Sequence, residues 1–373
     1  MIKVLLIGPL DPEIPKGDLK LLTGGETTYV RTLLSNPPKG VLYSHWSDAL
    51  EKRQIEFLFL HRILSILVKL RILPISSGTF CIRLKGDFDL VHSHSNSLKI
   101  VGKNIPVVIS DSSSNYLFLR DYINWSEWRI SIGYFLRRNL FKVLEVIDAD
   151  TNLENAKKLI VFSNFAKRVH LKLGAPKERT LVVRPGILDP GKKKKKLKEK
   201  ELHILFVGIW FERKGGRLVV EAFNKLSQKY QNIKLTIIGP VPKDIHLDKN
   251  RVEQVDFVPR EKLLSQYFPK ADIFVLVPLK AEGLGFVILE AASFGIPSIV
   301  SNVYALGEIV ENGKTGFVVK KANVAELQEK IELLIRNKKM REKMGLSARL
   351  KFEKDFLVDV MNERLLKIYK EVV

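Results

Sequence analysis

The sequence predicts an α/β protein with two domains, each built around a parallel sheet. Short apolar runs with β-branched residues, such as Lys3–Gly8, Ala271–Val277 and Ser298–Ser301, alternate with helix-compatible stretches along the chain. This alternation stops at a lysine-rich run, residues 192–200, and then begins again. The 373 residues are enough for two domains with separate cores. We therefore place the domain boundary at the lysine-rich run.

The composition is that of a globular protein from a reducing compartment. Apolar residues make up 46% of the chain and charged residues 28%. The single cysteine, Cys81, excludes an internal disulfide. The first residues are interpreted as a strand rather than a signal peptide, and the apolar clusters around residues 57–68 are too short to span a bilayer. We expect a cytoplasmic protein.

The formal net charge of +21 indicates an anionic partner. Nucleic acid, an acidic lipid surface and a phosphorylated acceptor would each satisfy that charge. No helix-turn-helix, zinc-ligand set or RNP-like strand is recognisable, so we expect no nucleic-acid partner. A lysine-rich thermophile surface would explain the charge as well as a membrane would, and both explanations stay open.

The first strand, Lys3–Gly8, leads through a Pro- and Asp-rich loop to a helix that opens with the sequence TGGETTYV. Thr23 and Glu26 have the spacing of a capping box, in which each side chain binds a backbone N–H of the helix start. A capping box does not require the two glycines Gly24 and Gly25. Because they have no side chains, they leave backbone N–H groups open to a phosphate or an acceptor. We also expect a second strand near residue 42 and a helix over residues 51–73.

The next informative strand ends in two histidines, His92 and His94. We expect the two rings to point to opposite sides, so that only one faces a ligand. His94 is our candidate, and His92 is interpreted as a buried or hydrogen-bonded residue. A His-x-His pair without other cysteine or histidine partners is a weak metal signal. The D-x-D at Asp87 and Asp89 precedes the strand and is interpreted as a surface turn, so we expect no metal site.

Aromatic residues are interleaved with arginines between residues 115 and 147. Such a stretch suits a lipid headgroup boundary or an acceptor groove. It suits a pair of helices packed on the sheet nearly as well, with Gly133 dividing them. The first half then closes with strands at Lys158–Ser163 and Thr180–Gly186, joined by a helix with Ser163 as its N-cap.

The second half opens with the strand His203–Gly208, followed by Arg213 and Lys214. Cations at the carboxyl end of a strand are well placed to hold a diphosphate. A later strand is expected at Val255–Val258, and its end, Val258, is expected beside the base of a nucleotide.

A strand, a glycine turn and a helix are then expected over residues 271–294. Backbone N–H groups around the turn and the positive end of the helix dipole favour an anion there; the residues concerned are Gly283, Leu284, Gly285 and Phe286. Glu282 lies in the turn and Glu290 eight residues later in the helix. Because carboxylates do not bind phosphate, these two would accept hydrogen bonds from hydroxyls on either side of it. On spacing alone, two solvated helix-end charges are the simpler explanation.

The stretch EGLGFVILEAASFGIPSIVS resembles the signature of the retaining glycosyltransferases of family 4, which have the GT-B fold. The resemblance implies that Glu282 lies near the transferred sugar and that Glu290 holds the ribose of the donor. Lys214 matches the family's K-G, whose cation binds the donor diphosphate. Ile209 stands where the family has arginine, and Arg213 is our candidate to supply that charge.

The first half resembles the same family more loosely. The sequence DLVHSH is similar to the family's D-x-V-H-x-H at the active-site rim, which implies that His94 lies close to the transferred sugar. The glycines Gly24 and Gly25 resemble the family's first glycine loop. The resemblance implies two Rossmann-like domains facing each other across a cleft, with the last helix returning to the first domain. The implied parts are residues 1–186 with 356–373, a linker at 187–200, and a nucleotide-sugar domain at 201–355.

The implied activity is retaining, metal-independent transfer of a sugar from a nucleotide sugar, UDP- or GDP-linked, with no further cofactor. The acceptor is expected to be a glycan or a lipid-linked molecule, with the protein peripheral at an anionic membrane surface. A glycogen-synthase-like or sucrose-type enzyme would share the donor site. Two alternatives of other classes remain: a non-catalytic GT-B scaffold, suggested by Ile209, and a basic nucleic-acid-binding protein.

Overall fold

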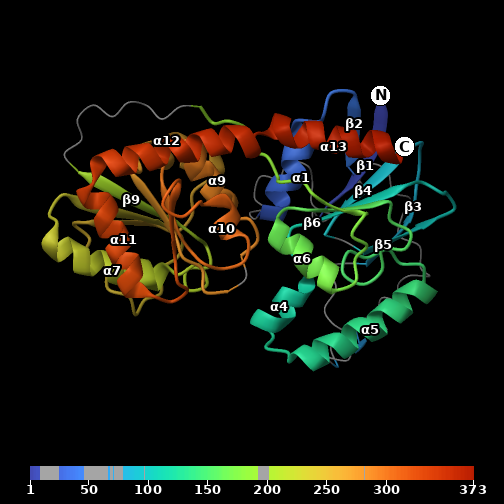
Figure 1. The fold of residues 1–373 in the computed structure, drawn as a ribbon, viewed down its shortest axis with the longest axis horizontal. Helices are drawn as coiled ribbons and strands as arrows, with labels where there is room; N and C mark the ends of the chain where they lie inside the picture. The colour runs from blue at the N-terminus through green and yellow to red at the C-terminus, as the bar shows by residue number, and fades with distance from the viewer. Residues whose placement is uncertain are drawn as a thin grey trace. The chain divides into compact units, whose positions relative to one another are not determined.

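The computed structural model describes residues 1–8, 25–45, 66–67, 70, 79–95, 97–191, 201–280 and 282–373. The chain divides into two compact units, Met1–Gly186 with Val358–Val373, and Ile187–Leu357 (Figure 1). Gly24, the lysine-rich run at 192–200 and almost all of the expected helix at 51–73 lie outside the described residues.

Unit 1 is built around a six-stranded parallel sheet in the order β2-β1-β4-β6-β7-β8. Apolar side chains of neighbouring strands, among them Leu5, Val91 and Ile109, are fully buried and form its core. A separate parallel pair joins β3 to β5. The strands are β1 (Ile2–Ile7), β2 (Val41–His45), β3 (Thr79–Arg83), β4 (Leu90–His94), β5 (Ser97–Val101), β6 (Val107–Asp111), β7 (Lys158–Val161) and β8 (Thr180–Val182).

The helices of unit 1 are α1 (Gly25–Ser35), α4 (Asn115–Asp121), α5 (Glu127–Val143), α6 (Asn164–Lys172) and α13 (Val358–Val372). Ser163 caps α6 as expected, because its hydroxyl accepts a hydrogen bond from the Ala166 N–H. The expected division of the aromatic stretch at Gly133 was wrong. The break lies between α4 and α5, whereas Gly133 is buried within α5, where a small residue packs against the unit.

The last helix, α13, packs within unit 1. The Tyr369 hydroxyl lies 2.8 Å from the hydroxyl of Tyr43, and the Asn362 side chain donates to the Asn36 carbonyl over 2.8 Å. Figure 1 shows α13 in red within unit 1, and its Tyr369 contacts Tyr43 of β2. The end of the chain therefore contributes polar contacts to the first sheet.

Unit 2 repeats the architecture with a parallel sheet in the order β11-β10-β9-β12-β13-β14. Its strands are β9 (Leu202–Val207), β10 (Ile233–Ile238), β11 (Val252–Val255), β12 (Ile273–Leu276), β13 (Ser298–Ser301) and β14 (Gly316–Val319). Its helices are α7 (Gly216–Lys229), α8 (Arg260–Lys262), η2 (Leu263–Tyr267), η3 (Phe268–Lys270), α9 (Phe286–Ser293), α10 (Leu306–Ile309), α11 (Val324–Arg336) and α12 (Lys338–Asp355).

The strand expected at Val255–Val258 was misplaced. β11 ends at Val255, where its parallel pairing with β10 stops at Ile238. The residues that follow, Asp256 to Pro259, lead into α8.

Each sheet has one position at which the strand order reverses. In unit 1, β2 lies on one side of β1, while β4 and the later strands lie on the other. In unit 2 the same reversal occurs between β9 and β12. Open α/β sheets bind ligands beyond the carboxyl ends of the strands at such a switch point. The fold thus marks one candidate ligand position in each unit.

Candidate functional site

The switch point of unit 2 brings two cations onto one carboxylate. Arg213 and Lys214 follow β9, and Glu282 follows the adjacent β12. Arg213 Nη1 lies 2.8 Å from Glu282 Oε2, and Lys214 Nζ lies 3.0 Å from Glu282 Oε1. The Glu282 side chain is only 10% exposed, so this charge cluster is shielded from bulk water. Three residues predicted for the site are therefore in direct contact, with an excess of one positive charge.

Glycine holds the two turns of this site together. Gly215 caps α7 in the left-handed region, with φ of 80°, and a Cβ there would lie 2.1 Å from the carbonyl oxygen of Val277. The Leu279 N–H also donates to the Arg213 carbonyl over 2.8 Å. The turn after β9 thus packs directly on the turn after β12, and this is why the K-G pair needs its glycine.

The glycine turn leads into α9 as the sequence predicts. Gly285 is the N-cap of α9 with φ of 65°, and the helix begins at Phe286. Since glycine offers no side chain to the first N–H groups of the helix, these groups and the helix dipole remain suited to an anion. Leu284 is 4% exposed and anchors the turn, while Gly283 is half-buried beside it.

Glu290 and Val258 are the remaining predicted site residues of unit 2. Glu290 is 3% exposed, and its Oε1 lies 2.7 Å from Nε of Arg260. Burial raises the pKa of Glu290, although the charge and hydrogen bond of Arg260 act in the opposite direction. Val258 is buried two residues before Arg260. Arg260 was not predicted from the sequence. The feature that could have indicated it is its position two residues after Val258, which is expected beside the base of a nucleotide.

Ile209, the residue that departs from the family pattern, is 46% exposed just beyond β9. It supplies no charge at this position. Arg213 lies instead on the same carboxylate as Lys214. A second cation is therefore present at the site, from a different position in the chain.

The switch point of unit 1 contains a buried polar network centred on Ser110. Its hydroxyl lies 2.8 Å from His92 Nε2 and 2.8 Å from His94 Nδ1. The two histidines therefore lie on the same face of β4, since side chains two residues apart in a strand share a face. Our expectation that they point to opposite sides was wrong. Both rings are fully buried.

Glu26 joins this network from the first turn of α1. His94 Nε2 forms a short contact with the Glu26 carboxylate, which also accepts hydrogen bonds from Ser95, over 2.9 Å, and from Ser112. Burial raises the pKa of Glu26, but His94 and the two serine hydroxyls outweigh it and lower the pKa to about 2. The carboxylate thus binds His94 of β4 and the serines that directly follow β4 and β6. Thr23, its partner in the expected capping box, lies outside the described residues. Gly25 beside it is exposed at the start of α1.

A third cluster of ionisable side chains, next to Ser95, consists of Asp111, Asp150 and His170. The Ser95 hydroxyl has one hydrogen, which lies within reach of Asp111, at 3.1 Å, as well as Glu26. His170 lies between Asp111, at 3.2 Å, and Asp150, at 3.8 Å. Among the described residues, these three could hold a metal ion by composition and spacing. Burial lowers the pKa of His170, but the two carboxylates outweigh it and raise the pKa. The two carboxylates therefore favour the protonated form of the buried imidazole.

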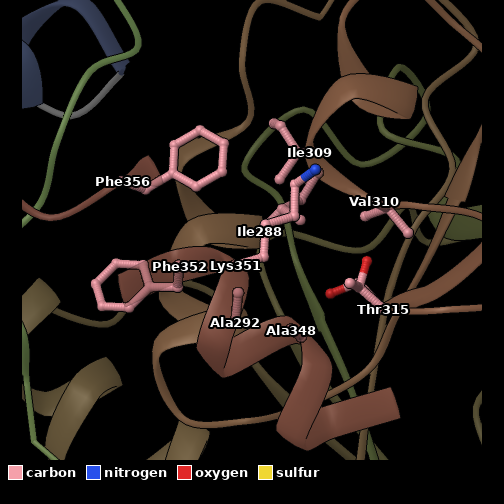
Figure 2. A pocket seen from close by; sticks show the side chains of 10 residues that line it. Ile288, Ala292, Ile309, Val310, Thr315, Ala348, Lys351, Phe352 and Phe356 are labelled. Atoms are coloured by element: carbon pink, nitrogen blue, oxygen red, sulfur yellow. The ribbon is translucent and has the colours of Figure 1, made fainter. Parts of the chain in front are cut away.

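A small pocket of unit 2 lies apart from these residues. Figure 2 shows Ile288 and Ala292 of α9 facing Ala348 and Phe352 of α12. On a helix, positions 288 and 290 lie on opposite sides, so this apolar pocket is behind Glu290 rather than part of the same site.

Structural comparison settles the architecture. Anabaena HepE, solved with UDP and glucose, has a TM-score of 0.64 and 15% identity, and the match covers 100% of both chains. Sucrose-phosphate synthase from Thermosynechococcus elongatus has a TM-score of 0.67 and 17% identity, covering 100% of this chain and 99% of that one. The fold is GT-B.

Sequence comparison agrees with the GT-B fold. Residues 189–351 match the family model described as glycosyl transferases group 1. The Staphylococcus aureus capsular polysaccharide biosynthesis glycosyltransferase CapM is 29% identical over 226 residues, which is 58% of this chain and 59% of CapM. An uncharacterized glycosyltransferase of Methanocaldococcus jannaschii is 30% identical over 45% of this chain and 48% of its own length. The matched region thus spans about half to three fifths of these relatives.

Proposed function

We propose that this GT-B protein is a glycosyltransferase that moves a sugar from a nucleotide-sugar donor to an acceptor hydroxyl. The observation that carries the proposal is the cluster of Arg213, Lys214 and Glu282 at the switch point of unit 2, beside the N-terminus of α9. The match to glycosyl transferases group 1 over this unit supports it, as does the similarity to HepE solved with UDP-glucose.

In this proposal the two cations bind the donor diphosphate. The bond from the sugar's anomeric carbon to phosphate breaks, and negative charge develops on the departing oxygen. Arg213 and Lys214, with the backbone N–H groups at Gly283–Phe286, stabilise that charge where it forms. Glu282, released from the cations by the diphosphate, accepts hydrogen bonds from the sugar hydroxyls.

Donor recognition extends to the nucleoside. Glu290 accepts hydrogen bonds from the ribose, and Val258 packs beside the base. Arg260, which neutralises Glu290 in the structure, holds that carboxylate in place. We favour a UDP-linked donor over a GDP-linked one, on the similarity to HepE with UDP.

We propose further that transfer retains the anomeric configuration, without a metal or another cofactor. The Glu-x7-Glu signature supports retention, and the paired cations supply the charge that phosphoryl leaving groups require. The new bond to the acceptor oxygen forms on the face that the diphosphate leaves, and the acceptor proton passes to the departing phosphate. No side chain is assigned as a covalent nucleophile.

A membrane-associated acceptor, lipid-linked or a membrane glycan, is favoured by the surface of α5. Five large apolar side chains are exposed on one side of this helix: Trp128, Ile132, Phe135, Leu136 and Val143. The helix carries four basic residues and one acidic residue, and the chain has a net charge of +21. Of the helices in the described part of the chain, none has the length and hydropathy of a bilayer span. We propose peripheral binding to an anionic membrane surface.

The test of the donor site is thermal stabilisation by UDP, GDP and ADP. A nucleotide at 100 times its dissociation constant adds about 2.7 kcal/mol to the free energy of unfolding. We expect UDP to stabilise the wild type, and Glu290→Gln to lose that shift, while Glu329→Gln, at an exposed position of the same unit, keeps it. Stabilisation by nucleic acid but by no nucleotide would favour the nucleic-acid-binding alternative, and stabilisation by neither would favour the scaffold.

A further inference from the structure

We propose that Glu26 is the side chain with which unit 1 binds the acceptor hydroxyl, and that His94 acts through Glu26 without touching substrate. This proposal rests on the proposed glycosyl transfer and assigns its acceptor contact. It differs from the expectation that His94 itself lies against the sugar.

His94 is enclosed on every side. One ring nitrogen, Nδ1, binds Ser110, and the other, Nε2, binds Glu26. The His94 ring stacks on Phe162, with ring centroids 5.4 Å apart and an interplanar angle of 16°. The centroid of the Tyr29 ring lies 4.6 Å from that of His94. The exposed fraction of His94 is 0%. With both nitrogens engaged and the ring covered, His94 has no atom with which to reach a sugar.

Glu26 is the point at which this network meets solvent. Its side chain is 38% exposed, in contrast to the fully buried His94. A carboxylate has about four lone-pair positions for hydrogen bonds. Within the described residues, three are taken: Ser112 by Oε1, and Ser95 and His94 by Oε2. One acceptor position remains on Oε1, which suits a single hydroxyl.

The position of Glu26 in the fold also favours a ligand. α1 follows β1, while Ser95 directly follows β4, so the carboxylate lies beyond the carboxyl ends of the two strands that flank the switch point. Ser95 adopts φ of 55°, a left-handed conformation that is costly for serine. That conformation allows its hydroxyl to reach both Glu26 and Asp111.

The hydrogen bonds behind Glu26 fix its orientation. An ionised carboxylate only accepts hydrogen bonds, so its short contact with His94 is favourable when Nε2 carries a hydrogen. Ser110 links His94 to His92, and His92 Nδ1 lies 2.5 Å from the hydroxyl of Tyr369 in α13. His94 is therefore a positioning residue, held in turn by the sheet and by the last helix.

The chemistry assigned to Glu26 is orientation rather than proton abstraction. A carboxylate that remains ionised at neutral pH is a weak base but a strong hydrogen-bond acceptor. It would align the acceptor hydroxyl for attack, while the proton leaves with the departing diphosphate as described above. The ligand class is thus an alcohol, such as a sugar or polyol hydroxyl.

The experiment uses full-length protein, a panel of UDP-sugars and glycerol as the probe acceptor, with UDP release and glycoside formation measured together. For Glu26→Gln we expect at least a tenfold loss of kcat/KM for glycerol, with unchanged thermal stabilisation by UDP, because the assigned donor contacts lie in unit 2. Glu145→Gln, at a 70% exposed position of unit 1, serves as the matched control and should retain full activity.

A second comparison tests whether His94 acts through Glu26. His94→Asn should lower kcat/KM for glycerol, and the double variant should be no worse than Glu26→Gln alone, because residues that act as a unit are not additive. Additive losses, or full transfer by Glu26→Gln, would overturn the proposal. A wild type that is stabilised by none of UDP, GDP and ADP and that turns over none of their sugars would instead refute the proposed function, and this inference with it.

Discussion

Lys214 Nζ lies 3.0 Å from Glu282 Oε1, and the other oxygen of the same carboxylate lies 2.8 Å from Arg213. The group proposed to orient the sugar is thus bound by the two cations proposed to hold the diphosphate. Under the proposed function, a diphosphate would compete with Glu282 for these cations and, by binding them, would free the carboxylate for the sugar. Donor binding and sugar orientation would then be coupled through one ion cluster.

This coupling predicts opposite effects of Glu282→Gln on binding and on chemistry. Removing the competing charge should raise the affinity for UDP severalfold, because both cations are then left to the diphosphate. Loss of the ionised sugar contact should lower kcat by a factor on the order of 100. Calorimetric UDP titration and initial rates would measure the two effects. Weaker UDP binding by the variant would argue against the competition.

A stability prediction concerns Gly215. Its φ is 80°, and a Cβ at this position would lie 2.1 Å from the Val277 carbonyl oxygen, so there is no room for a side chain. We expect Gly215→Ala to lower the free energy of unfolding by at least about 2 kcal/mol and to weaken UDP binding, because the turns of Lys214 and Glu282 must move apart. Gly307→Ala is the control, since a Cβ at Gly307 meets nothing within 4 Å. Urea unfolding compares the two variants.

The meeting of Arg213, Lys214 and Glu282 at one edge of the sheet could be predicted from the sequence, because each residue follows a local strand pattern. Arg213 and Lys214 follow one apolar run and Glu282 follows another, and parallel strands place their carboxyl ends at one edge of a sheet. The ion pairing itself was not predicted. Glu282 was expected to face sugar hydroxyls, whereas the structure binds it to both cations.

Unit 1 was harder to predict, since its network depends on residues far apart in the sequence. Glu26 matched a capping box, and only the fold brings it to Ser112, 86 residues away. Tyr369 reaches His92 across 277 residues of chain. No local pattern encodes such contacts, and the capping-box spacing offered a simpler local explanation for Glu26.

The buried His92 predicts a pH dependence of stability. Burial, and then the charge of His94, lower the pKa of His92 from 6.5 to about 3. Between these values the unfolded chain binds a proton that the folded protein does not, so the free energy of unfolding falls as pH falls, by at most about 1.4 kcal/mol per pH unit. Glu26, with a pKa of about 2, acts in the same direction but only below about 4.5.

We therefore expect His92→Gln to reduce the slope of stability against pH between 6.5 and 4.5. Hydrogen exchange of the β4 amides, corrected for the intrinsic effect of pH, reports this slope for unit 1. His246→Gln, at an exposed position of unit 2, should leave it unchanged. An equal slope in wild type and His92→Gln would show that His92 does not titrate differently in the folded and unfolded states.

The last prediction concerns the exposed apolar side of α5. Trp128 is 68% exposed and Phe135 66%, and they lie on the same side of a helix whose opposite side, with Ile130 and Phe141, is buried. We expect the protein to bind vesicles of phosphatidylcholine mixed with phosphatidylglycerol, more weakly at high salt and weakly to phosphatidylcholine alone.

Replacing both aromatic residues with serine should weaken vesicle binding by roughly tenfold or more, since each buried aromatic side chain contributes about 1.5–3 kcal/mol. The matched control replaces Leu346 and Leu350 with serine; these are 62% and 56% exposed on α12. Cosedimentation with vesicles measures binding, and UDP stabilisation verifies the fold of both variants. If the charge alone holds the protein at the membrane, the Trp128 and Phe135 variant will bind as the control does. Only a selective loss identifies the α5 surface as the membrane contact.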